Sequence, residues 1–160
     1  VERRSHNPAF TVEAIEEAIA EADRHGIGGP IRSRMNGFYR MAREQEFRKV
    51  KEEVRVAKCL GYRPAIEWRV ARRCLKLARE AHSSTMMKQA VGIARLCRRT
   101  NLRLVNACAD LLEHWERQEQ SNEEEAQRQQ RETEEVLEYA REAEEYAREG
   151  EDYFMNTMIY

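Results

Sequence analysis

The stretch PAIEWRVARRCLKLAREAH, residues 64–82, separates into two classes of side chain when it is wound at 100° per residue. One third of the wheel carries the apolar residues Ile66, Val70, Cys74, Leu77, Ala78 and Ala81. The opposite side carries the cations Arg69, Arg72, Arg73, Lys76 and Arg79. The pattern predicts an amphipathic helix that begins at Pro64, a residue type suited to a first helical turn, and ends near His82.

The segments on either side of this stretch also show helical spacing of their apolar residues. We expect a first helix that begins after Asn7-Pro8 or at Thr11, a fair N-cap, and ends at Gly26. A second is expected from about Asn36 to Leu60, closed by Gly61. Two more are expected after Ser83-Ser84 and after Thr100 or Asn101. The glycine-rich residues 26–30 between the first two helices are expected to act as a hinge. With 7 Gly and 3 Pro in 160 residues, the sequence predicts an all-α bundle of four to five helices.

The C-terminal third has a different composition. Residues 116–135 contain no large apolar side chain, so this stretch is expected to be a solvated helix or partly disordered, with a helix restart at Ser121. From Glu138 the sequence repeats in sevens, which predicts a long, acidic, coiled-coil-like helix that Gly150 interrupts. The expected organisation is residues 1–33 as N-terminal helix and hinge, 34–118 as basic bundle, and 119–160 as acidic helix with an apolar tail.

Charge is divided along the chain although the formal net charge is only −1. Residues 1–103 hold 23 of the 28 Lys and Arg but 12 of the 29 Asp and Glu, a net charge of +11. Residues 104–160 hold the other 5 and 17, a net charge of −12. Such asymmetry indicates an anionic partner such as nucleic acid for one part, or pairing between the two parts.

Motifs for catalysis or cofactor binding are not found in this sequence. The four cysteines lie within helical apolar patterns without a Cys-x-x-Cys pair, so they are read as reduced core thiols, with no metal site. No nucleophile–base set or phosphate-binding loop is recognisable, so we expect no enzyme and no cofactor. The chain start lacks an apolar signal-peptide core, and no run reaches the roughly 18 apolar residues of a membrane span. An intracellular protein, cytoplasmic or nuclear and without a membrane role, is therefore expected.

The arginine-rich faces are the strongest functional signal. The candidate nucleic-acid-binding residues are Arg69, Arg72, Arg73, Lys76, Arg79, Arg95, Arg98 and Arg99. Arg outnumbers Lys by 23 to 5, and a guanidinium binds phosphate with two parallel hydrogen bonds. Two other readings stay open: a solvated face of an amphipathic helix, or a face neutralised by the acidic helix of the same chain. If nucleic acid binds, we expect contact with its backbone, with RNA favoured over DNA.

Tyrosines recur every seven residues in the acidic third and form a narrow apolar seam with small residues. The candidate partner-binding residues are Tyr139, Ala143, Tyr146, Tyr153, Phe154 and Ile159. A helix this polar needs a partner for its seam, so a protein partner or a homo-oligomer is expected. Two functions follow: a helical nucleic-acid-binding protein that also recruits a partner, or a structural subunit of a larger assembly with no nucleic-acid role.

Overall fold

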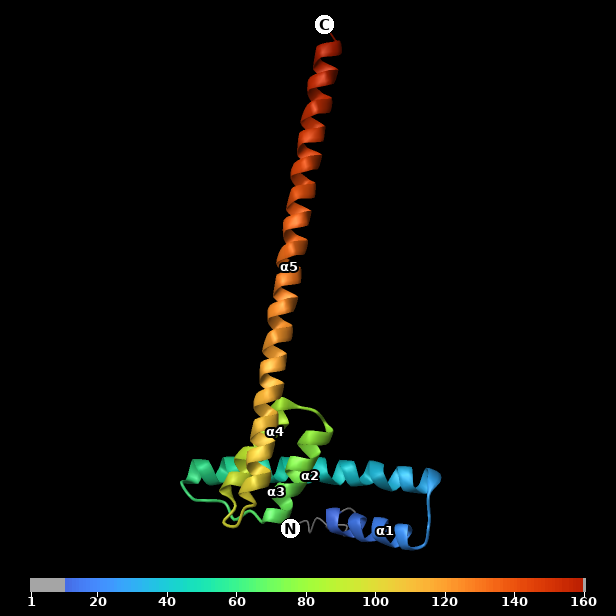
Figure 1. Cartoon of the computed structure of the whole chain (residues 1–160), viewed down its shortest axis with the longest axis vertical. Helices are drawn as coiled ribbons and strands as arrows, with labels where there is room; N and C mark the ends of the chain where they lie inside the picture. Colours follow the sequence, from blue (N-terminus) through green and yellow to red (C-terminus); the bar gives the residue numbers. More distant parts are fainter. Residues whose placement is uncertain (1–10, 160) are drawn as a thin grey trace, which may run out of the picture. The chain divides into compact units, whose positions relative to one another are not determined.

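The computed structural model describes residues 11–159, and within them the chain forms helices joined by short turns (Figure 1). The helices are α1 (Val12–Arg24), α2 (Gly29–Leu60), α3 (Trp68–Glu80), α4 (Ser84–Leu96) and α5 (Leu102–Met158). The fold is therefore all-α with a long C-terminal helix, as the sequence predicts. The described residues up to Glu113 form one compact unit, and those from His114 onward form a second.

Polar side chains cap three of these helices where the sequence places them. The Thr11 hydroxyl accepts a hydrogen bond from the Ala14 amide at 3.3 Å, and the Ser83 hydroxyl accepts one from the Met86 amide at 3.3 Å. The Asn101 carboxamide oxygen accepts one from the Leu104 amide at 3.2 Å. Each bond satisfies an amide that has no partner in the first helical turn, which fixes where the helix begins.

Two of the predicted helix starts are wrong. The second helix begins at Gly29 instead of Asn36, because Pro30 fits its first turn, so Gly29 and Pro30 of the expected hinge are helical while residues 26–28 are not. The third helix begins at Trp68 instead of Pro64. Residues 62–67 before it form no helix, and Arg63 in this segment donates two hydrogen bonds, of 3.2 and 2.9 Å, to the Leu96 carbonyl at the end of α4. The predicted end of the second helix is confirmed, since Gly61 adopts φ +75°.

The core of the N-terminal unit lies between α2, α3 and α4, with α1 packed on the first half of α2. Val12 and Ile15 of α1 are buried against Ala42 of α2. The residues buried in the larger core include Phe47, Val50 and Ala57 of α2, Cys74, Leu75 and Leu77 of α3, and Met87, Val91 and Ile93 of α4. Val105 and Cys108, in the first turns of α5, are buried as well.

The breaks predicted in the C-terminal third are absent from the described chain, since α5 continues from Leu102 to Met158 without a turn. Glu, Gln and Arg are good helix formers, and Gln side chains bond to Glu four residues on, as in Gln130–Glu134 at 3.1 Å. Gly150 costs about 1 kcal/mol in a helix relative to alanine, which is too little to end it. None of the described helices combines the length and hydrophobicity that a membrane span requires.

Candidate functional site

Arg73, one of the cations predicted on the basic face of α3, is buried, with 8% of its surface exposed. Its Nε donates to a Glu46 carboxylate oxygen at 2.8 Å, and its Nη2 donates to Glu13 at 3.0 Å. The Glu16 carboxylate lies 3.8 Å from its Nη1. The hydrogen bond with Glu46 raises the pKa of Arg73 above its ordinary value. The prediction that Arg73 binds phosphate is therefore corrected. Its guanidinium instead forms ion pairs that link α3 to α1 and α2.

A second buried arginine, Arg43 of α2, lies at the same junction and was missed from the sequence. It is 5% exposed, donates to the Glu80 carboxylate at 2.7 Å, and stacks 4.2 Å from the centre of the Tyr39 ring. Its position in the sequence indicates burial, because Arg43 precedes Phe47 by four residues and therefore falls within the apolar face of α2. Part of the basic charge is thus used inside the fold.

Seven of the eight candidate nucleic-acid-binding residues are exposed, namely Arg69, Arg72, Lys76, Arg79, Arg95, Arg98 and Arg99. Arg69 forms an ion pair with Glu67 at 2.8 Å, and the Lys76 ammonium lies 6.0 Å from the centre of the Tyr39 ring. The five other arginines form no ion pair with any residue in the described range 11–159. Their charges are consequently available to an external anion.

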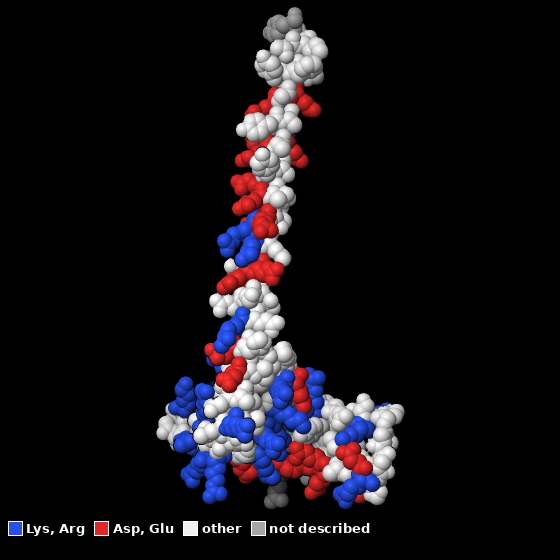
Figure 2. All heavy atoms as spheres, in the orientation of Figure 1, with Lys and Arg blue, Asp and Glu red and all other residues white. Residues whose placement is uncertain are grey.

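These five arginines come from elements that adjoin in the fold. Arg72 and Arg79 lie on α3, Arg95 lies on α4, which packs along α3, and Arg98 and Arg99 follow in the turn before α5. In Figure 2, blue side chains dominate much of the visible face of the N-terminal unit, and red ones gather mainly near α1. Arg63, which the sequence reading did not single out, adds an exposed cation at the end of α4. We refer to Arg72, Arg79, Arg95, Arg98 and Arg99 as the arginine surface.

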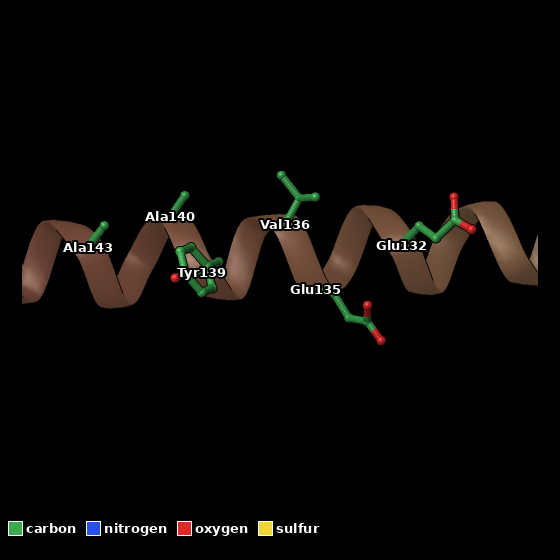
Figure 3. A pocket seen from close by; sticks show the side chains of 6 residues that line it. All are labelled: Glu132, Glu135, Val136, Tyr139, Ala140 and Ala143. Atoms are coloured by element: carbon green, nitrogen blue, oxygen red, sulfur yellow. The ribbon is translucent and has the colours of Figure 1, made fainter.

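The second candidate surface lies on α5, where every described residue from Glu116 to Ile159 is exposed. Tyr139, Tyr146 and Tyr153 have 77%, 74% and 75% of their surface exposed. Phe154 and Ile159 are also exposed, at 59% and 75%, but Ile159 lies beyond the last residue of the helix. Figure 3 shows Val136, Ala140 and Ala143 on one side of the helix, where they line a shallow hollow with Tyr139, Glu132 and Glu135.

The three buried cysteines lack the environment of a reactive nucleophile. Burial raises the pKa of Cys74 to about 12 and also raises the pKa of Cys97 and Cys108, which keeps these thiols protonated at neutral pH. Cys59 is exposed. Among residues 11–159, no group of three or more His, Cys, Asp or Glu side chains is arranged to hold a metal ion.

Comparison with known proteins gives no relative from which a role could be transferred. No protein-family model, no curated protein and no solved structure matches this chain. The functional argument therefore depends on the arginine surface and on the exposed face of α5.

Proposed function

We propose that this protein is a non-enzymatic helical binding protein that holds the backbone of nucleic acid, RNA in preference to DNA, on its arginine surface. The observation that carries the proposal is the set of five exposed arginines without an ion-pair partner in the described chain. Other exposed arginines of the N-terminal unit are paired, such as Arg24 with Glu21 and Arg55 with Glu52.

The chemistry of the arginine surface fits phosphate. A guanidinium offers two parallel N–H donors to a phosphate, and such contacts supply most of the sequence-independent affinity for nucleic acid. The sequence contains no helix-turn-helix or RNA-recognition motif that would read bases. Backbone and shape recognition, the usual mode for double-stranded RNA, is therefore the expected mode of binding.

Charge reversal tests this proposal. Fluorescence anisotropy with labelled single-stranded RNA, duplex RNA and duplex DNA would compare the wild-type chain with the triple variant Arg72→Glu, Arg79→Glu and Arg95→Glu. At low salt we expect the variant to bind at least about 100-fold more weakly, because three phosphate contacts become repulsive.

The matched control reverses three exposed arginines that are paired within their own helices, Arg24, Arg40 and Arg55. This control changes the net charge by the same amount and is expected to lose much less affinity. Equal losses in the two variants would show only a dependence on net charge. Absence of binding to all three probes at low salt would contradict the proposal.

A structural subunit of a larger protein assembly is the second candidate, and the exposed apolar face of α5 favours it. Under this alternative, deletion of residues 123–160 abolishes assembly while the arginine surface has no effect. Light scattering of the full and shortened chains, each with and without the Arg72, Arg79 and Arg95 reversals, separates the two functions.

A further inference from the structure

Tyr62 is an exposed aromatic residue in the segment that joins α2 to α3. It has 52% of its surface exposed, and its hydroxyl forms no hydrogen bond with any residue in the described range 11–159. Other aromatic side chains of the N-terminal unit are used inside the fold, since Tyr39 is half-buried and Phe47 is buried. Tyr62 therefore presents an aromatic surface that the fold leaves partly uncovered.

Hydrogen bonds fix the chain on both sides of this ring. The Tyr62 amide donates to the Ala57 carbonyl at 3.0 Å, within the Schellman motif that Gly61 forms at the end of α2. On the other side, the Arg63 side chain donates to the Leu96 carbonyl at 3.2 and 2.9 Å. A residue held in this way loses less conformational entropy when it binds a ligand than one in a free loop.

The hydrogen bonds of Arg63 also bring the segment after α2 to the turn between α4 and α5 (Figure 1). Leu96, which accepts them, is followed two residues later by Arg98. Burial raises the pKa of Cys97, and the nearby charge of Arg63 opposes this rise, which is a second sign that the two segments adjoin. Tyr62 is therefore placed beside the arginines of this turn, although they lie more than 30 residues away along the chain.

The two segments that adjoin here carry only positive charge. Residues 58–63 and 95–99 contain 5 basic residues and no acidic residue. All five basic residues are exposed, and none forms an ion pair with another residue of the described chain. We call Tyr62 and these residues the Tyr62 cluster, which consists of Tyr62, Lys58, Arg63, Arg95, Arg98 and Arg99. Its last three members belong to the arginine surface, so the aromatic ring lies at the edge of that surface.

We propose that the Tyr62 cluster binds single-stranded RNA, with the Tyr62 ring stacked on an unpaired base and the arginines on the flanking phosphates. Aromatic stacking combined with a positively charged surface is the general chemistry of single-strand binding. A duplex offers its phosphates to the arginines, but its bases are paired and stacked on one another, so no base face is open to Tyr62. The inference rests on the proposed function and adds a preference for the single strand. Every base has a face that can stack, so no sequence preference follows.

Three variants of the full-length chain and three labelled probes of equal length provide the test. Tyr62→Leu removes the ring but keeps an apolar side chain after the Schellman glycine, where such a side chain often packs on the preceding turn. Tyr62→Phe keeps the ring and removes the hydroxyl. The matched control Leu60→Ala removes apolar surface from a residue that is 69% exposed and two positions away. The probes are single-stranded RNA, duplex RNA, and an abasic strand that has the sugar–phosphate backbone without bases.

Fluorescence anisotropy at several salt concentrations measures the outcome. Tyr62→Leu is expected to bind single-stranded RNA about 10-fold more weakly than the wild-type chain, since it loses one base stack. Its affinity for the duplex and for the abasic strand is expected to change by less than about twofold, because the phosphate contacts remain. The dependence of its RNA affinity on salt is also expected to match that of the wild type, since stacking releases no counterions. Tyr62→Phe should retain the ring-dependent affinity, and Leu60→Ala should bind all three probes as the wild type does.

Three results would overturn the stacking proposal and leave the proposed function standing, because the wild-type chain still binds RNA in each. Full affinity of Tyr62→Leu for single-stranded RNA shows that the ring takes no part. Equal losses for all three probes show that the ring supports the protein surface and not a base. Equal losses in Tyr62→Leu and Leu60→Ala show a general apolar contact. A wild-type chain that binds none of the probes at low salt contradicts the proposed function, and the stacking proposal with it.

Discussion

At the scale of single residues, the neighbouring arginines 72 and 73 of α3 have opposite roles. Arg73 is buried among the carboxylates of Glu13, Glu16 and Glu46, whereas Arg72 is exposed and forms no ion pair with a described residue. A guanidinium withdrawn from water needs such partners, because an unpaired buried charge is strongly destabilising. The same residue type therefore supplies a tertiary contact at one position and an exposed charge at the next.

Replacing each of these arginines by methionine distinguishes the two roles. We expect Arg73→Met to lower the free energy of unfolding by about 3 kcal/mol, because it leaves the half-buried carboxylates without their counter-charge. Arg72→Met is expected to change it by less than about 0.5 kcal/mol. Urea denaturation of the two variants measures the difference, and equal effects would contradict the assignment.

The same cluster predicts how stability responds to acid. A hydrogen bond with its own backbone lowers the pKa of Glu13 below the ordinary 4.5, and the charge and hydrogen bond of Arg73 lower it further against the opposing effect of burial. A lowered pKa in the folded state means that ionised Glu13 contributes stability above pH 4.5, and that this contribution is lost as the pH falls through the folded value.

The comparison of wild type with Glu13→Gln isolates this contribution. The difference in unfolding free energy is expected to be present at about pH 6 and to shrink steadily as the pH falls below about 4.5. Urea denaturation at several pH values measures it. A difference that remains constant to about pH 3 would show that Glu13 is not the titrating group.

The sequence predicts the basic and apolar faces of α3 but not which cation enters the core. On the helical wheel Arg73 lies nearer the apolar face than Arg69 does, which is a sign of its burial. Its partners Glu13 and Glu46 are 60 and 27 residues away along the chain. Local periodicity contains no information about such pairings, because they arise only when α1 and α2 pack beside α3.

At the scale of elements, α5 shows how far helix propensity can outweigh an expected break. Its residues from Glu116 onward are exposed, so no tertiary burial supports them in the described structure. Residues with good helix propensity and hydrogen bonds between neighbouring turns maintain the helix through the polar stretch and through Gly150.

Alanine substitutions at Gly61 and Gly150 compare a glycine that its backbone conformation requires with one that an α-helix merely tolerates. A Cβ atom added at Gly61 or at Gly150 would meet no atom within 4 Å, but Gly61 has φ +75° whereas Gly150 lies within a helix. We expect Gly61→Ala to destabilise the N-terminal unit by about 1 kcal/mol. Gly150→Ala is expected to raise the helical circular dichroism signal on mild heating.

Thermal melts followed by circular dichroism measure both effects in one experiment. The decisive result is that the same substitution, glycine to alanine, destabilises the protein at position 61 and stabilises the helix at position 150. Destabilisation by Gly150→Ala would contradict the description of α5 as a helix that extends past this residue.

Helix ends that a local cap determines were more predictable than the starts of α2 and α3. Thr11, Ser83 and Gly61 act locally, so their effect can be read from a few neighbouring residues. The segment before α3, in contrast, contains Arg63, which donates hydrogen bonds to the carbonyl of Leu96, 33 residues away along the chain. Whether α5 is continuous or interrupted depends on the cost of Gly150 in a helix, about 1 kcal/mol relative to alanine. A pattern of residue types does not resolve so small a free-energy difference.

At the scale of the whole molecule, the positive and negative charges lie on different surfaces. In Figure 2 the C-terminal unit shows more red than blue among its white side chains, whereas the N-terminal unit is rich in blue ones. Arg43 and Arg73 use part of the positive charge within the fold, and the arginine surface leaves another part available. The exposed part of α5 carries mainly negative charge. One chain therefore carries a basic surface and a separate acidic one.

The salt dependence of RNA affinity is the most direct measurement of the central claim, that the arginine surface binds phosphate. For the wild-type chain, the logarithm of the association constant for single-stranded RNA is expected to fall linearly with the logarithm of salt concentration. Five phosphate contacts predict a slope of about −3.5, and the triple Arg72, Arg79 and Arg95 reversal should make this slope markedly shallower. A slope near zero for the wild-type chain, or no detectable binding at low salt, would contradict the account.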